Sequence, residues 1–328
     1  MKYVLHLLLA VTLLFLNVTA YAESDAVKML ERLGIVAKQL NYDGIFSYQA
    51  GSKLQSIRII HHADEHGEVE RLVSLNGITR EVIRNNDMVT CVYPVGKSVQ
   101  ENHRPLGRGF PAELLRMLSD ASDYYQVSQG QQGLVAKHHT QELLMKPIDN
   151  YRYGYSLWFD KDNDLLLQAN IINEMGDVLE TFAFASVKMN IEIPDELLKP
   201  QIQGNEMTWN RKEQHMKRYT IAMTNNEPLW QFDFLPEGFK LVTQKNRFKA
   251  KNGAPIDQRV YSDGLNSISV FIEKIRTQHG HLHGRSHKGI VNAFGTIISG
   301  HFITVVGEVP AITVEKVGAS IQYIAGDL

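Results

Sequence analysis

The chain has 328 residues, with 34 Lys and Arg against 36 Asp and Glu, which gives a formal net charge of −2 at pH 7. This balance gives no electrostatic basis for binding nucleic acid or an anionic membrane surface. There is one cysteine, Cys91, so no disulfide can form within the chain. Its place in an apolar, strand-like run is typical of a buried thiol rather than a reactive one.

The first 22 residues have the pattern of a secretory signal peptide. Lys2 precedes a nearly continuous apolar run at 4–16, and Ala20-Tyr21-Ala22 has the small-x-small form of a cleavage site. The apolar run is too short to be read as a membrane span. We therefore expect an exported protein, and its lack of disulfides favours the periplasm of a Gram-negative cell.

Residues 23–193 predict a first domain of helices and strands. Helical spacing of apolar residues and strand-like runs separated by turn residues indicate its elements, and Asn76-Gly77 is the strongest hairpin signal. In chain order we expect a helix at Asp25–Leu40, strands at 45–49, 54–61, 69–75, 78–84 and 88–93, a helix at Pro111–Tyr125, and strands at 134–138 and 142–146.

The stretch from Tyr151 to Met189 is the centre of this domain. Three extended segments are joined by two short turns rich in Asp, Asn and Gly, which predicts an antiparallel meander. Because side chains alternate along a strand, Tyr153 and Leu157 share one face, and Phe182 adds to an apolar face of the same sheet. Such a face must be covered by helices, by another sheet or by an apolar ligand.

A break follows at residues 194–216, which contain Pro, Gly and charged residues with little apolar periodicity and are predicted to be a linker. A second domain is expected at 217–328. Its predicted elements are strands at 230–234, 239–248, 259–262, 267–275, 289–298 and 301–307, and a final helix that begins at Pro310. The two domains together give the α+β class.

One short motif suggests a zinc hydrolase. His62-Ala63-Asp64-Glu65-His66 matches H-x-x-E-H, in which two histidines bind zinc and the glutamate activates water. That chemistry requires both histidines on one face of a helix. Here the motif lies between two strand-like runs and ends at Gly67, so a polar hairpin turn is the favoured interpretation.

A second histidine cluster lies in the C-terminal half. Imidazole is a favoured ligand of transition metals, but the cluster is interrupted by glycines and has no carboxylate or cysteine to complete a site. A solvated loop is the favoured interpretation, and metal binding is left open. The residues concerned are His279, His281, His283 and His287. No catalytic residue, cofactor or metal is predicted, which favours a binding protein over an enzyme.

Several stretches of the chain resemble the periplasmic sigma-E regulators of the RseB/MucB family. The resemblance extends over nearly the whole mature chain and both predicted domains. The stretches are Leu40–Tyr48, Glu70–Gly77, Arg80–Asn85, Tyr151–Asp160, Val260–Leu265, Ser269–Glu273 and Thr304–Pro310.

This resemblance implies a particular fold and function. The N-terminal domain would be a half-open antiparallel β-barrel with helices, similar to the lipoprotein carriers LolA and LolB, and the C-terminal domain a smaller antiparallel sheet with a helix. The family is non-enzymatic. Its members bind the periplasmic domain of an inner-membrane anti-sigma factor of the RseA or MucA type and shield it from site-1 proteolysis. Lipoprotein acyl chains or lipopolysaccharide relieve the shielding. The alternative is a periplasmic carrier of lipids or lipoproteins.

Candidate site residues follow from the resemblance and the apolar face together. For partner binding they are Tyr261, Ser262, Asp263, Gly264, Thr304, Val306 and Glu308. For lipid binding they are Phe46, Tyr48, Tyr153, Leu157 and Phe182. The first set contains residues that also form turns, and the second set also suits an ordinary core. The oligomeric state, including a homo-oligomer, is left open.

Overall fold

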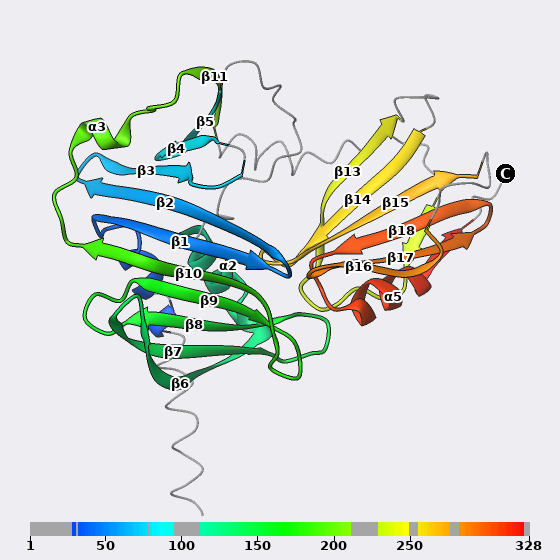
Figure 1. The fold of residues 1–328 in the computed structure, drawn as a ribbon. Helices are drawn as coiled ribbons and strands as arrows, with labels where there is room; N and C mark the ends of the chain where they lie inside the picture. The colour runs from blue at the N-terminus through cyan, green and yellow to red at the C-terminus, as the bar shows by residue number, and fades with distance from the viewer. Residues whose placement is uncertain are drawn as a thin grey trace, which may run out of the picture.

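The computed structural model describes residues 28–30, 32–77, 79–94, 112–210, 229–248, 255–275 and 282–324. The predicted signal peptide lies outside these residues. Within them the chain forms two parts, one built on an eleven-stranded antiparallel sheet and the other on a six-stranded antiparallel sheet (Figure 1). Each part has its own apolar core. The predicted α+β class and the larger and smaller sheets are confirmed.

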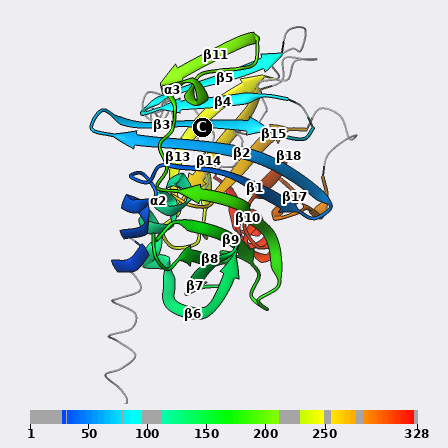
Figure 2. The same cartoon turned by 60° about the vertical axis from the view of Figure 1, so that its left-hand side comes forward.

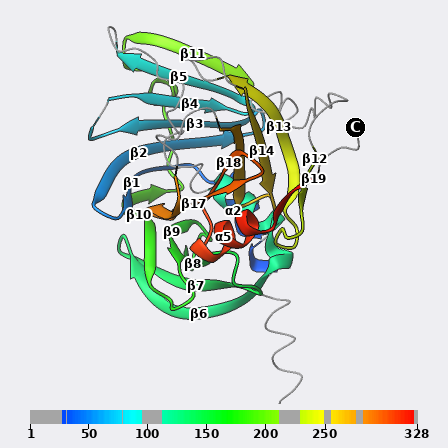
Figure 3. The ribbon, with the colours of Figure 1, turned by 90° about the vertical axis from the view of Figure 1, so that its right-hand side faces the viewer.

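The large sheet consists of two antiparallel series, β1–β5 and β6–β10, which are joined where β1 pairs with β10. Its edges are β11 and β6, so the sheet is not closed, and Figures 2 and 3 show how strongly it curves. Its strands are β1 (Tyr42–Ala50), β2 (Lys53–Asp64), β3 (Gly67–Ser74), β4 (Glu81–Asn85), β5 (Met88–Pro94), β6 (Tyr125–Val135), β7 (His138–Pro147), β8 (Gly154–Asp160), β9 (Leu166–Ile172), β10 (Val178–Met189) and β11 (Gly204–Asn210).

Two turns of this sheet show where the local sequence predicted the chain reversal and where it did not. The chain reverses at Asn76-Gly77 between β3 and β4, as predicted, and Gly77 has the positive φ of 76° that glycine adopts without steric cost. The predicted strand at 134–138 is wrong, because the chain turns at Ala136 and Lys137 with φ of 49° and 71°. Neither residue is a turn former, so the pairing of β6 with β7 decides this turn.

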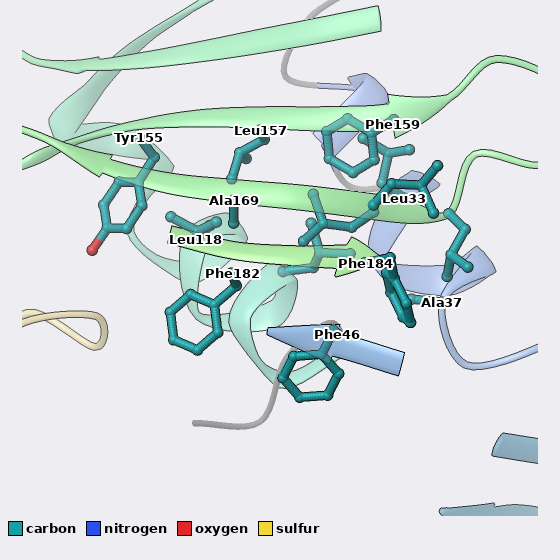
Figure 4. Packing of buried hydrophobic residues seen from close by; sticks show 14 of the residues in the cluster. Leu33, Ala37, Phe46, Leu118, Tyr155, Leu157, Phe159, Ala169, Phe182 and Phe184 are labelled. Atoms are coloured by element: carbon teal, nitrogen blue, oxygen red, sulfur yellow. The ribbon is translucent and has the colours of Figure 1, made fainter. Parts of the chain in front are cut away.

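Helices cover the concave face of the large sheet. Residues 28–30 and 32–36 are helical, α2 comprises Ala112–Asp120, and the short 3-10 helix η2 comprises Ser122–Tyr124. The second predicted helix therefore ends before Tyr125, which begins β6. Leu33 and Leu118 are fully buried in the same cluster as the strand residues, and Figure 4 shows this packing. Apolar side chains from opposite sides thus fill the interior.

The predicted linker at 194–216 is wrong for part of its length. This range contains the short helix α3 (Asp195–Leu198) and β11, which pairs with β5 at the edge of the large sheet. Arg71 and Glu81 form a buried ion pair beneath α3, where Arg71 Nη1 donates to the carbonyl of Leu197 at 3.1 Å. The sheet extends to Asn210 because a distant strand edge was available to pair with, which local composition does not reveal.

The smaller sheet has the order β13-β14-β15-β18-β17-β16, with α5 packed against one face. Its core contains Ile303 and Val305 from the sheet and Val314 and Val317 from the helix. Sequence patterns missed β16 and β19, which are short and mostly exposed. The elements are β12 (Leu229–Phe232), β13 (Lys240–Phe248), β14 (Pro255–Ser262), β15 (Ser267–Lys274), β16 (Gly284–Lys288), β17 (Val291–Ile298), β18 (His301–Gly307), α5 (Ala311–Ala319) and β19 (Ile321–Ile324), with β12 and β19 paired.

Candidate functional site

The five residues predicted to face a lipid lie in or beside the core of the large domain. Phe46 and Leu157 are fully buried, and Phe182 is almost so (Figure 4). The ring of Tyr48 stacks on Phe182 with 4.5 Å between centroids, and its hydroxyl donates to Glu180. Together with the helices described above, the chain's own side chains cover this face. An acyl chain would reach Phe46 or Leu157 only after a helix moved away.

The segment Tyr261–Gly264, predicted to contact a partner, has Tyr261 and Asp263 buried, whereas Ser262 is half-buried and Gly264 is exposed. Tyr261 has only 6% of its surface exposed and packs on Phe232. Asp263 accepts hydrogen bonds from the backbone N–H groups of Leu265 and Asn266, and Gly264 has a φ of 100°. The Ser262 hydroxyl donates to the carbonyl of Asn266 at 2.8 Å. The segment is a tight turn that leads from β14 into β15.

The remaining predicted partner residues lie on or just after β18. Thr304 and Val306 are half-buried and alternate with the buried Ile303 and Val305. Since Ile303 and Val305 belong to the core beneath α5, Thr304 and Val306 point to the opposite face of the sheet. Glu308 follows the strand and is also half-buried. These three residues are therefore more accessible than the buried Tyr261 and Asp263.

Arg152 connects the two domains. Its Nε donates to Asp263 Oδ2 at 2.8 Å, and its two terminal nitrogens donate to Asp149 and to the carbonyl of Glu237. The side chains of Arg152 and Asp263 are completely buried. The guanidinium lies 4.5 Å from the ring centroid of Tyr124 and 5.1 Å from that of Phe239. The guanidinium of Arg152 thus lies between the two domains and contacts residues of both, and we call this arrangement the Arg152 contact.

The residues on both sides of Arg152 also bind the second domain. The Tyr151 carbonyl accepts from Thr313 Oγ1 at 3.0 Å, in the first turn of α5. Lys316, one turn further along this helix, lies over the Tyr151 ring, with 4.9 Å from its Nζ to the centroid. Tyr153 accepts a hydrogen bond from Asn292, which also donates to the carbonyl of Val309. A segment of three residues therefore makes contacts with α5, with β17 and with the turn after β14.

Buried tyrosines complete this junction. Asn266 donates to the hydroxyl of Tyr125 at 3.4 Å, and the Tyr125 ring packs edge-on against Tyr155 of β8. Burial raises the pKa of Tyr125 far above that of a free phenol, and burial likewise raises the pKa of Tyr153. Both hydroxyls therefore stay neutral at physiological pH, and they can act as hydrogen-bond donors or acceptors here.

The sequence did not indicate most of this junction. No sequence pattern singled out Arg152, because residues 151–153 precede β8, which begins only at Gly154, and they leave the sheet to meet the second domain. Asp149, Glu237 and Asn292 carried no signal of their own. The stretches that resemble the RseB/MucB family did point to the junction. Residues of the junction come from three of them, Tyr151–Asp160, Val260–Leu265 and Thr304–Pro310.

The structure also places the histidine motifs. His62 lies in β2 and His66 in the turn before β3, so the helix that a zinc peptidase requires is not there and the predicted polar turn is confirmed. His283 packs on Phe302, and His287 is exposed in β16. His279 and His281 lie outside the described residues. Among those that are described, no group of three or more His, Cys, Asp or Glu side chains is placed to hold a metal ion.

The single cysteine of the sequence lies in β5. Cys91 is buried in the core, as predicted, and burial raises its pKa. In the part of the chain that the structure describes, no helix has the length and apolar character needed to cross a membrane.

Two protein-family models match the chain in order. The model of the MucB/RseB N-terminal domain matches residues 25–202, and that of the MucB/RseB C-terminal domain matches residues 224–322. The chain belongs to the MucB/RseB family. This confirms the resemblance noted in the sequence, and it groups the chain with regulatory proteins rather than with a family of enzymes.

Relatives within the MucB/RseB family are similar over almost their whole length. The sigma factor AlgU regulatory protein MucB of Pseudomonas aeruginosa is 29% identical over 318 residues, which cover 93% of each protein. The sigma-E factor regulatory protein RseB of Escherichia coli (strain K12) is 22% identical over 323 residues, which cover 94% of each.

A solved structure supports the same grouping. A chain in the complex structure of Pseudomonas aeruginosa MucA/MucB is 27% identical and superposes with a TM-score of 0.69. The superposition covers 92% of this chain and 100% of that chain. It therefore includes both domains of this chain.

Proposed function

We propose that this MucB/RseB protein is a periplasmic negative regulator of a sigma-E type stress response. It binds the periplasmic domain of an RseA/MucA-type anti-sigma factor and shields that domain from site-1 proteolysis. The observation that carries the proposal is the match to the MucA/MucB complex over both domains, together with family membership. The protein acts by binding and not by catalysis.

The accessible face of the C-terminal sheet is the proposed seat of the partner. Thr304 and Val306 point away from the core beneath α5, and Glu308 continues the same strand. The turn at Tyr261–Gly264 contributes differently, because Tyr261 and Asp263 are buried and Asp263 binds Arg152. We propose that this turn supports partner binding by fixing the position of the C-terminal sheet, and that the partner touches the β18 residues.

Binding is tested with the purified mature chain and the periplasmic domain of an RseA/MucA-type anti-sigma factor from the same organism. Isothermal titration should show association at micromolar concentration or tighter, and the complex should resist cleavage by the site-1 protease. Val306→Arg places a charge on the proposed face and should weaken binding. Lys245→Glu on β13, an exposed position at the edge of the same sheet, is the matched control. Absence of association by the wild-type protein would remove the proposal.

Lipid or lipoprotein signals would act through the apolar interior of the N-terminal domain. The interior is lined by Phe46, Leu157 and Phe182 and covered by helices rather than by another sheet. A helix that packs on a curved sheet can be displaced by an acyl chain, since each buried methylene contributes about 0.8 kcal/mol. Adding a triacylated lipopeptide to the complex should release the anti-sigma domain, whereas the deacylated peptide should not. The carrier alternative predicts stoichiometric lipid in the purified protein without partner binding.

A further inference from the structure

The Arg152 contact does more than join two domains. We propose that it fixes the domains in the orientation that holds the partner, and that its opening is the step by which the partner is released. The release half of this inference rests on the proposed function. The orientation half depends only on the contacts of Arg152, Asp149 and Asp263.

The charged groups of the Arg152 contact favour a single orientation of the two domains. A single guanidinium serves two carboxylates and a backbone carbonyl, and the Arg152 and Asp263 side chains have no exposed surface. Removing one member of a buried ion pair leaves an uncompensated charge, which is far more unfavourable than losing an exposed pair. A small rotation between the domains would separate Nε from Asp263 without giving either group to water. Intermediate orientations of the domains are therefore unfavourable. The junction is either closed, with Arg152 bound to Asp263, or open, with both groups in contact with water.

The surroundings of Arg152 reinforce this two-state behaviour. The rings of Tyr124 and Phe239 lie against the guanidinium, one from each domain. Gly238, next to Phe239, approaches the Tyr124 ring so closely that a Cβ atom there would lie 2.2 Å from the ring carbon Cζ. Surfaces that meet this tightly fit in one orientation. Outside such an orientation the cation loses its charged partners and its aromatic neighbours together.

The junction is built so that it can open without unfolding either domain. Many of its direct contacts are hydrogen bonds from polar groups, such as Thr313 to Tyr151 and Asn292 to Tyr153. Polar groups regain hydrogen bonds to water when they separate, whereas apolar cores do not. Polar interfaces between domains therefore permit relative motion. Apolar contact across the junction comes from Ile290 and Leu265 of the C-terminal domain, which pack against the core of the large domain.

The position of Arg152 in the chain connects the junction to the interior. Residues 151–153 lead directly into β8, whose Tyr155 and Leu157 line the apolar core. Tyr155 also packs against Tyr125, whose hydroxyl accepts from Asn266 of the C-terminal domain. An acyl chain that displaced β8 or the helices packed on it would move the residues that hold Arg152. Occupancy of the interior and domain orientation are thus mechanically linked.

The closed orientation is the one that holds the partner. The superposition on MucB in the MucA/MucB complex includes both domains, so the closed junction seen here is compatible with a bound anti-sigma domain. Because a ligand shifts an equilibrium toward the state that it prefers, the partner should close the junction and an open junction should bind it less well.

Spin labels on the two domains test the orientation. Lys161→Cys on the turn after β8 and Lys274→Cys at the end of β15 place labels on exposed positions of different domains, in a Cys91→Ala background. Double electron–electron resonance on the otherwise wild-type mature chain should give one narrow distance distribution. Arg152→Gln should broaden it or add a second distance, and the anti-sigma domain should restore the narrow one. Arg152→Lys keeps the positive charge but loses the planar guanidinium, so its distance distribution should be intermediate in width between those of the wild type and Arg152→Gln.

A control variant and a second variant of the Arg152 contact accompany this measurement. Arg285→Gln makes the same chemical change in the C-terminal domain, where Arg285 forms an exposed pair with Glu315, and should leave the distance unchanged. Asp263→Asn weakens the contact from the other side and serves if Arg152→Gln does not fold, as monitored by thermal unfolding. In titrations, Arg152→Gln should raise the Kd for the anti-sigma domain about tenfold, a usual size for coupling between sites.

The possible results distinguish the role of Arg152 in domain orientation from its role in partner release. A folded Arg152→Gln or Asp263→Asn protein with the narrow wild-type distance overturns the role of Arg152 in orientation. A broadened distance with an unchanged Kd overturns the link between opening and release. If the wild-type protein binds no anti-sigma domain, the proposed function and the release half fail together, while the distance result still decides the orientation half.

Discussion

The ring of Tyr42 lies flat against the imidazole of His61, with 4.9 Å between the ring centroids and 12° between their planes. Both side chains are buried at the end of the helix that closes the interior, and His61 Nδ1 lies 2.7 Å from the carbonyl of Leu40. His61 Nε2 has no hydrogen-bond partner and lies 3.7 Å from a carboxylate oxygen of Glu68. Protonation of Nε2 would give this buried nitrogen a partner after a small movement.

This arrangement predicts a dependence of stability on pH. Burial opposes the charge on His61, but the nearby carboxylates of Glu68 and Glu70 and the Leu40 carbonyl outweigh it, so the pKa of His61 is raised. A raised pKa in the folded state stabilises the fold fully below the unfolded value of about 6.5, and that contribution is lost as pH rises through the folded-state pKa.

We therefore expect the free energy of unfolding, measured with urea, to fall as the pH rises above about 6.5 and His61 loses its proton. The His61→Gln protein should show a flatter profile over this range. His66→Gln, at an exposed position of the turn after β2, should behave as the wild type. Equal pH profiles for His61→Gln and wild type would contradict the role given to this histidine.

Replacement of a residue that fills the interior should be severe. Phe46 is completely buried, so Phe46→Ala should lower the free energy of unfolding by about 3–5 kcal/mol through lost burial and a new cavity. Leu134→Ala, at a position 64% exposed, should change it by less than about 0.5 kcal/mol. Urea denaturation measures both. A cost near that of Leu134→Ala would show that the interior around Phe46 is not packed as described.

The ion pair beneath α3 should stabilise the edge of the large sheet. Glu81 accepts from Arg71 and from the backbone N–H of Gln201, which leads into β11. Glu81→Gln leaves the buried Arg71 without its counter-charge and should cost about 3–5 kcal/mol in chemical denaturation. Asp164→Asn removes an exposed pair with Arg32 and should cost less than about 1 kcal/mol. Similar costs for the two variants would refute this assignment.

The close approach of Gly238 to Tyr124 can be separated from backbone strain. Gly238 and Gly176 have φ of 83° and 86°, but only Gly238 has a neighbour where a Cβ would be placed. Gly176→Ala should therefore cost about 1–2 kcal/mol from the left-handed backbone alone. Gly238→Ala should cost about 1–3 kcal/mol more because the domain junction is overpacked. Thermal unfolding of both proteins tests this, and equal losses would show that the junction tolerates the methyl group.

Local patterns were sufficient for most strands and for the class of the fold. Side-chain alternation placed Leu157 and Phe182 on the apolar face correctly, and the Asn76-Gly77 turn fell where it was predicted. The same reasoning failed at Ala136-Lys137 and at β11, because pairing with another strand decided those positions. Short-range signals report what a segment prefers, whereas an edge strand is fixed by what lies beside it.

By itself, the sequence determined the two sheets, the buried apolar face and the family, since these depend on side-chain period and on ordered stretches of similar residues. Only the tertiary structure decided what covers that face, and that Arg152 meets Asp263 across 111 positions of the chain. The reason is physical: a buried charge needs a partner in space, and nothing in the spacing of residues along the chain specifies which carboxylate the fold will bring to it.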